Sequence, residues 1–149
     1  MKVKIKRLTP TAQVPHYATP GSACFDLVAD SIEDTGWAPR MLTRDSPRIY
    51  GTGLVFEIPP GKVMLIFSRS GHGFNDDIRL SNCVGVIDSD YRGEVKVKLA
   101  KDTMGYHTFV EGSRIAQAMI VDFERVDFEV VESLEPTARG EGGFGSTGT

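Results

Sequence analysis

The residues best suited to chemistry are two aspartates in the stretch NCVGVIDSDYRGEV, residues 82–95. Asp88 and Asp90 fall at a turn, where aspartate is common because its side chain bonds its own backbone. That structural explanation suffices for one of the two, whereas the other can hold a water molecule as a general base. Tyr91 offers a flat ring to a sugar, and Asn82 can both donate to and accept from the edge of a pyrimidine.

A second segment, FSRSGHGFN at residues 67–75, combines side chains that hold phosphates. Arg69, Ser70 and Gly71 supply a charge, a hydroxyl and a backbone amide that an anion can approach. The segment is not a GxxxxGK[ST] loop, and an ordinary glycine-rich loop explains the same residues. Gln117 is polar within the apolar run of GSRIAQAMI, a position that usually faces solvent.

The last eleven residues, RGEGGFGSTGT, cannot build a core, because glycine is costly to order and buries little. Their composition suits a nucleotide instead. Arg139 can bind phosphate in a bidentate manner, Ser146 and Thr147 add hydroxyl donors, and Phe144 can stack on a base. We therefore predict a flexible arm that folds over a nucleotide, with a disordered terminus as the alternative.

Asp26 follows a Gly-Ser turn in TPGSACFDL, residues 19–27. A structural carboxylate satisfied by N–H groups and a place near metal-bound water are equally compatible with this position. The three histidines have no metal-ligand spacing, so any metal must arrive with a ligand or sit on carboxylates. Cys24 and Cys83 are far apart and outside any CxxC, which predicts free, buried thiols.

Short strands must position these residues, because apolar or alternating runs recur between turn signals. The expected strands are residues 2–7, 24–29, 48–57, 62–67, 84–87, 94–99, 114–122 and 126–131. Residues 62–67 are expected to be buried on both faces, and residues 82–99 to form a hairpin. No segment has a long helical period with caps. The pattern predicts one all-β domain, a barrel or jelly-roll-like sandwich, at residues 1–131, followed by the arm at 132–149.

Composition narrows the function classes. A chain of 149 residues suits a single domain. Its net charge of −3 argues against a nucleic-acid coat but not against an anionic ligand. No apolar run approaches the roughly 20 residues of a membrane span, and the N-terminus lacks the apolar region of a signal peptide. The expected location is the cytoplasm, or the host cytoplasm for a viral protein.

Taken together, the motifs resemble the trimeric deoxyuridine triphosphate nucleotidohydrolase (dUTPase) family. Its five motifs appear in order as ATPGSACFDLVA, SRSGHG, NCVGVIDSDYRGEV, GSRIAQ and RGEGGFGSTG, from residue 18 to residue 148. The resemblance implies a jelly-roll-like β-barrel in a homotrimer with active sites at subunit interfaces. The implied reaction is hydrolysis of dUTP to dUMP and pyrophosphate with Mg²⁺ on the triphosphate. This reaction limits uracil incorporation into DNA and supplies dUMP for dTMP synthesis.

The resemblance also implies residue roles. Asp88 would activate the water that attacks the α-phosphorus, and Tyr91 would pack on the deoxyribose and disfavour a ribose. Phe144 would cover the uracil, and Asp26 would approach the metal through water. The resemblance assigns base reading to Asn82 and the main chain of Gly85, Val86, Ile87 and Lys96. It assigns phosphate binding to Arg69, Ser70, Gly71, Gln117, Arg139, Gly145, Ser146 and Thr147.

The chain departs from the family pattern at four positions, none of them assigned to chemistry: Cys24 for glycine, Ser68 for proline, His72 for an aliphatic residue and Ser113 for an acidic one. Residues 30–50, which include Trp37, are a polar excursion and a candidate contact region for a protein partner.

Three alternatives to the dUTPase interpretation remain. A dCTP deaminase has the same fold but lacks the Asp-Ser-Asp-Tyr turn. A nucleotide-gated binding protein would use the scaffold to switch a partner. A purely structural β-protein leaves the order of five motifs unexplained.

Overall fold

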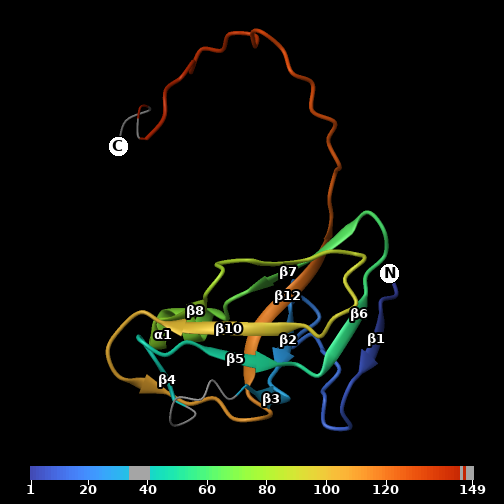
Figure 1. The fold of residues 1–149 in the computed structure, drawn as a ribbon, viewed down its shortest axis with the longest axis vertical. Coiled ribbons are helices and arrows are strands. Elements are labelled where there is room, and N and C mark those ends of the chain that lie inside the picture. The colour runs from blue at the N-terminus through green and yellow to red at the C-terminus, as the bar shows by residue number, and fades with distance from the viewer. Residues whose placement is uncertain (34–40, 145, 147–149) are drawn as a thin grey trace.

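The computed structural model describes residues 1–33, 41–144 and 146, and most of its regular structure is β-strand (Figure 1). One sheet has the order β2-β12-β7-β9, formed by Phe25–Val28, Arg114–Asp122, Lys62–Phe67 and Gly85–Ile87. The other has the order β3-β5-β10-β8, formed by Ser31–Ile32, Arg48–Gly51, Lys96–Lys101 and Ile78–Leu80. Two strand pairs complete the fold, β1 (Lys4–Arg7) with β6 (Leu54–Glu57) and β4 (Leu42–Thr43) with β11 (Tyr106–His107).

One hydrophobic core joins the two large sheets, and strand alternation creates it. In β10 the side chains of Val97 and Leu99 are buried, while Lys96 and Lys98 between them are exposed. Their core partners include Met64 of the other sheet. Burial of such apolar side chains stabilises the fold by about 25 cal/mol per Å² removed from water. The predicted all-β architecture is therefore confirmed.

The expected strand at residues 48–57 is interrupted by Thr52 and Gly53. The Thr52 hydroxyl donates to the Val95 carbonyl oxygen at 2.7 Å, and the Leu54 amide donates to the Thr52 hydroxyl at 3.2 Å. Gly53 adopts a φ of 65°, which side chains disfavour. This turn separates β5, in the four-stranded sheet, from β6, which pairs with β1.

The predicted hairpin at residues 82–99 is wrong as a pairing. β9 pairs with β7, whereas β10 pairs with β5 and β8, so the two strands belong to different sheets. The turn after β9 is closed instead by the Tyr91 amide, which donates to the Asp88 carbonyl oxygen at 3.2 Å. Among the described residues, the edge of β9 away from β7 has no paired strand.

A short helix, α1 (Ser70–Asp76), stands where the sequence indicated only a glycine-rich loop. None of its side chains is buried, and its sequence SGHGFND has no apolar period. Arg69 caps it without a side-chain hydrogen bond, and Asp77 ends it in a left-handed conformation with a φ of 53°. Hydrophobic patterning could not reveal this helix because it contributes nothing to the core.

The strand expected at residues 126–131 is also wrong in this chain. After Asp122 the backbone leaves the barrel as an extended segment (Figure 1). The alternating apolar side chains Val126, Phe128 and Val130 are 62%, 92% and 98% exposed. The pattern is that of a strand with one apolar face, but no strand in the described part of the chain pairs with this segment.

The predicted burial of β7 and of the two cysteines differs in part from the structure. β7 is buried mainly on one face, through Met64 and Ile66, rather than on both. Cys24 and Cys83 are free thiols as predicted, but the first is half-buried and the second exposed rather than both buried. No helix within the described ranges is long and apolar enough to cross a membrane.

Candidate functional site

Three of the five motifs meet at a pocket of about 300 Å³. β12 lies between β2 and β7, so residues in register on these strands are neighbours. Gln117 of β12 stands opposite Asp26 of β2 on one side and opposite Phe67 of β7 on the other. Phe67 precedes Arg69 by two residues. The pocket is lined by Ala18, Ser22, Ala23, Cys24, Asp26, Arg69, Arg114 and Gln117.

Asp26 joins two arginines at this pocket. Its Oδ1 accepts from Arg69 Nε at 2.9 Å, and its Oδ2 accepts from Arg114 Nη1 at 3.2 Å. A register shift between Arg114 and Ala116 at the start of β12 bends the strand next to Arg114. One carboxylate faces two guanidinium groups, so the pocket keeps a positive charge and suits an anion.

Gln117 is half-buried rather than on a fully solvated face. Its Nε2 donates to the Ser68 carbonyl oxygen at 3.0 Å, which ties β12 to the loop before α1. Ser68, where the family has proline, accepts from the Leu80 amide through its hydroxyl at 2.9 Å. Ser70 and Gly71 open α1 and are exposed beside this loop.

His72 packs behind the arginines. Its Nε2 donates to the Arg114 carbonyl oxygen at 3.0 Å and lies 3.4 Å from Arg69 Nη1. Its ring meets Phe109 edge-on, with 4.9 Å between ring centroids. His107 lies beside the same rings, and burial lowers the pKa of His107. His72 therefore holds the backbone of one pocket arginine and contacts the side chain of the other.

The residues expected to act on the base, the sugar and water do not line this pocket. Asp88 is exposed, and its carboxylate bonds to none of the described residues. Tyr91 is 44% exposed, and its hydroxyl donates to the Glu94 carbonyl oxygen at 3.1 Å. Asn82 is exposed, and its backbone carbonyl oxygen accepts from the Val84 amide at 2.7 Å. Cys83, between these two residues, has a φ of 63°.

The main-chain candidates lie on β9 and at the start of β10. Gly85 is buried so closely that an added Cβ would lie 3.1 Å from Ile66 Cβ. Val86 is exposed and Ile87 half-buried. The Lys96 ammonium bonds Glu33, and this bond raises the pKa of Lys96. Its side chain is thus engaged elsewhere, and only its backbone remains for a base.

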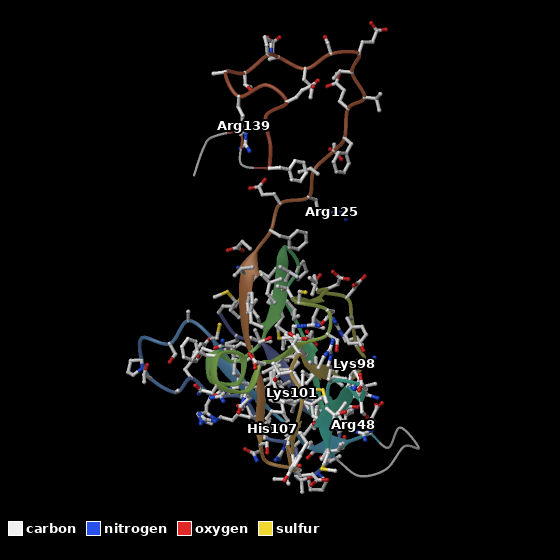
Figure 2. The ribbon with its side chains drawn as sticks, turned by 90° about the vertical axis from the view of Figure 1, so that its left-hand side faces the viewer. Arg48, Lys98, Lys101, His107, Arg125 and Arg139 are labelled. Atoms are coloured by element: carbon white, nitrogen blue, oxygen red, sulfur yellow. The ribbon has the colours of Figure 1, made fainter. Side chains whose placement is uncertain are left out.

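The described part of the arm, residues 132–144 and 146, stands far from the barrel (Figure 1). Figure 2 shows Arg139 at the opposite end of the molecule from Lys98 and Lys101. Arg139 Nε donates to the Gly142 carbonyl oxygen at 2.8 Å, and Phe144 is fully exposed. Ser146 bonds the Gly143 carbonyl oxygen through its amide. Gly145, Thr147 and Trp37 lie outside the described residues. Among the described residues, one chain therefore brings Arg69 and Gln117 to one pocket, but not the turn at Asp88 or the described part of the arm.

Sequence reasoning gave no role to Arg114, which the structure adds to the pocket. Its only signal was its place in GSRIAQ, three residues before Gln117. No group of three or more His, Cys, Asp or Glu side chains that could hold a metal occurs in the described part of the chain. The carboxylate nearest the anion pocket is Asp26, which lines it.

Comparisons with known proteins identify the family. The dUTPase family model matches residues 11–148. The deoxyuridine 5'-triphosphate nucleotidohydrolase of Nautilia profundicola is 43% identical over 148 residues, covering 99% of each chain. That of Thiobacillus denitrificans is 44% identical over 149 residues, again covering 99% of each.

Solved structures share the fold. A Staphylococcus bacteriophage 80alpha dUTPase with dUPNHPP has a TM-score of 0.83 at 23% identity, covering 99% of each chain. A mutant dUTPase from phage phi11 of S. aureus, in which a structural Mg(II) ion is coordinated, has a TM-score of 0.74 at 18% identity, covering 89% and 98%. These likenesses confirm the jelly-roll-like β fold, and the full-length sequence matches show that the chain belongs to the dUTPase family.

Proposed function

We propose that the chain hydrolyses dUTP to dUMP and pyrophosphate in the cytoplasm, or in the host cytoplasm if the protein is viral. The observation that carries this proposal is the anion pocket at which Asp26, Arg69, Arg114 and Gln117 meet. Relatives more than 40% identical over their full length are dUTP nucleotidohydrolases, which supports the choice of substrate.

Arg69 and Arg114 would hold the triphosphate. Charged donors fixed in advance stabilise the charge that develops on a transferring phosphorus without reorganising during the reaction. Asp26 keeps both guanidinium groups oriented, and Gln117 is fixed through its amide nitrogen, which leaves its amide oxygen for a ligand or water. Ser70 and Gly71 add a hydroxyl and a backbone amide at the edge of the same loop.

Mg²⁺ fits this arrangement as an ion carried by the triphosphate. The described residues include no ready-made cage of acidic or histidine ligands, and Mg²⁺ commonly binds through substrate phosphates and water. Asp26, which lines the pocket, would contact such an ion through water. When bound, the metal neutralises charge on the phosphate oxygens.

Asp88 would serve as the general base for the attacking water. Its carboxylate is exposed and engaged by none of the described side chains, so it is available to accept a proton from water. Tyr91 would pack on the deoxyribose. Asn82 and the main chain of Gly85, Val86, Ile87 and Lys96 would read uracil, since the edge of β9 away from β7 is unpaired within the described residues.

A homotrimer would complete each site. Within one chain, the turn at Asp88 and the described part of the arm do not line the anion pocket. The exposed apolar face of Val126, Phe128 and Val130 also requires cover, because soluble chains rarely leave such patches bare. We infer that neighbouring subunits supply both the missing residues and this cover, and light scattering of the purified chain tests the expected threefold mass.

The arm at residues 132–149 would close over the substrate. A glycine-rich segment pays a large ordering cost, which is offset only when a ligand supplies partners. Arg139, Gly145, Ser146 and Thr147 would reach the γ-phosphate, and Phe144 would cover the uracil. Residues 30–50 remain a proposed contact region for a protein partner, and their described part presents the exposed Arg44 and Asp45.

Pyrophosphate release from dUTP, dTTP, dCTP and UTP in the presence of Mg²⁺ tests the proposed function. Selective release from dUTP supports it. Ammonia release from dCTP would instead indicate the deaminase chemistry found on the same fold. Binding of dUTP without turnover would contradict the proposal and favour the nucleotide-gated binding protein.

A further inference from the structure

A second polar hollow, of about 480 Å³, is separate from the anion pocket of the family motifs and shares no lining residue with it. We call it the basic groove. It is formed where the loop after β4 approaches β8 and β10, and Figure 2 shows two of its residues, Lys98 and Lys101, close together on the barrel. Its lining residues are Arg44, Pro47, Arg79, Ser81, Lys98, Ala100, Lys101 and Asp102.

The basic groove concentrates positive charge in a chain whose net charge is −3. Four of its lining side chains are cationic and only Asp102 is anionic. The anion pocket, by comparison, has two arginines facing one aspartate. Like charges held near one another repel, and a bound anion relieves that repulsion. By charge, the basic groove is therefore the stronger anion attractor of the two.

Two of the four cations are already engaged. Arg79 Nε donates to both oxygens of Asp102, at 3.1 and 2.9 Å, and this pair raises the pKa of Arg79. The Lys101 ammonium donates to the Asp76 carbonyl oxygen and to the Thr103 hydroxyl. The side chains of Arg44 and Lys98, in contrast, bond to none of the described residues. These two side chains are available to a ligand.

The groove also contains an unused hydroxyl. Ser81 Oγ is buried, and no described residue is its hydrogen-bond partner. Buried polar atoms nearly always have a hydrogen-bond partner, so we expect this oxygen to bind water or a ligand. The Ser81 amide is used elsewhere, because it donates to the Lys98 carbonyl oxygen at 2.9 Å. Ala100, which lines the same groove, is small and buried.

A compact anion fits better than an added peptide strand. β8 is an edge strand, but its Leu80 amide already donates to Ser68 Oγ, so part of that edge is not free for a new backbone. The free groups are instead a guanidinium, an ammonium and a hydroxyl, which together match phosphate oxygens.

We propose that the basic groove is a second anion site, which binds a phosphate-bearing small molecule through Arg44, Lys98 and Ser81. Inorganic phosphate, pyrophosphate and the phosphate of a nucleotide share this chemistry. The proposal does not depend on the chain hydrolysing dUTP, because no residue of the groove belongs to the family motifs' anion pocket.

The test is a titration of the ¹⁵N-labelled full chain, followed by the amide signals of Ser81, Lys98 and Lys101. Pyrophosphate, inorganic phosphate and dUMP are the separate probes. An Arg69→Gln background weakens binding at the anion pocket and isolates the groove. We expect saturable shifts of the groove amides with at least one probe, weakened by added salt because exposed charges are screened. The probe that binds most tightly identifies the source of the phosphate.

Matched variants separate a built site from general charge. Arg44→Gln with Lys98→Gln should weaken groove binding by about tenfold or more, since two charge-assisted contacts are lost. Lys6→Gln with Arg7→Gln removes the same charges from exposed positions on β1 and should leave anion binding at the groove unchanged. The dispersion of the ¹⁵N amide spectrum, with signals remote from the groove unchanged, serves as the folding check for both pairs. Groove amides that ignore all three probes, or equal weakening by both pairs, would overturn the proposal.

Discussion

Arg69 Nε donates to Asp26 Oδ1 at 2.9 Å, which joins the loop after β7 to β2 across the anion pocket. The same carboxylate accepts from Arg114 at the start of β12. Both partners in the Arg69 pair are largely buried, at 22% and 13% side-chain exposure. The arginine geometry proposed to bind phosphate therefore depends on one aspartate that need not touch the substrate.

Replacing Asp26 by asparagine should separate orientation from charge. Asp26→Asn makes the pocket more positive, but it leaves one acceptor oxygen and sets an amide N–H donor against the other guanidinium group, so it cannot hold both arginines. Because Arg69 is mostly buried, we expect the lost geometry to dominate: KM for dUTP should rise, and the free energy of unfolding should fall by about 1–3 kcal/mol. Urea unfolding and steady-state kinetics measure the two effects.

The matched control for this substitution is Asp122→Asn. Asp122 pairs with Lys62, but its side chain is 84% exposed. Exposed pairs contribute about 0–1 kcal/mol, so this variant should be nearly silent. Equal effects of the two substitutions would show that the Asp26 contacts have no special role.

Gly93→Ala should disturb the proposed contact of Tyr91 with the deoxyribose without replacing Tyr91 itself. An added Cβ would lie 2.3 Å from the Tyr91 hydroxyl oxygen and 2.5 Å from ring carbon Cζ, so the ring must move. If Tyr91 packs on the deoxyribose, the ratio of kcat/KM for dUTP over UTP should fall, by about tenfold for a 1.4 kcal/mol loss. Gly73→Ala, whose Cβ would meet only a carbonyl oxygen at 3.8 Å, is the control. An unchanged ratio in Gly93→Ala would refute the role given to Tyr91.

His72→Leu should raise KM for dUTP more than it lowers kcat. Leucine preserves apolar contact with Phe109 but cannot donate to the Arg114 carbonyl oxygen. A lost neutral hydrogen bond costs about 0.5–1.5 kcal/mol, which corresponds to a few-fold change in KM. His72→Gln keeps a donor at similar reach and should restore most of the difference. If both variants match the parent chain, His72 only fills space.

Because the Tyr50 hydroxyl is buried, we expect the fold to lose stability in alkaline solution. Burial raises the pKa of Tyr50 to about 12, and the described residues offer its hydroxyl no hydrogen-bond partner. The unfolded chain releases this proton near its ordinary pKa of about 10, whereas the folded chain retains it. The contribution of the protonated Tyr50 hydroxyl to the free energy of unfolding is therefore complete below pH about 10. It is lost as pH rises towards 12, by about 1.4 kcal/mol per pH unit.

Tyr50→Phe isolates this effect from other alkaline titrations. The difference in unfolding free energy between the two chains should shift in favour of phenylalanine above pH about 10. At neutral pH the variant should lose little stability, because the removed hydroxyl has no partner among the described residues. A pH-independent difference would contradict the assigned pKa.

Local patterns predicted the parts of the fold that depend on local information. The alternation of Lys96, Val97, Lys98 and Leu99 correctly predicted a strand with one buried face. Arg69 and Gln117 were singled out from residue type and motif, and the structure brings both to one pocket. The bond between Asp26 and Arg69 joins residues 43 positions apart, which no local pattern encodes.

The errors have the same physical origin. The alternation at Val126 and Phe128 is a genuine strand signal, but a strand forms only where another strand supplies hydrogen bonds, and the described part of this chain supplies none to it. The hairpin failed because β9 and β10 find partners in different sheets. Pairing is a long-range property, so period and turn signals cannot assign it.

The most direct test of the account compares Asp88→Asn with Asp90→Asn in pyrophosphate release from dUTP. The two aspartates flank Ser89 in the same exposed turn, but Asp90 lines a hollow with Lys2 and Lys4 of the N-terminal segment. We predict that Asp88→Asn lowers kcat by about 10²–10⁴, as expected for loss of a general base, while Asp90→Asn stays within a few-fold of the parent chain. Undiminished release in Asp88→Asn, or an equal loss in both variants, would contradict the assignment of Asp88 as the group that activates water.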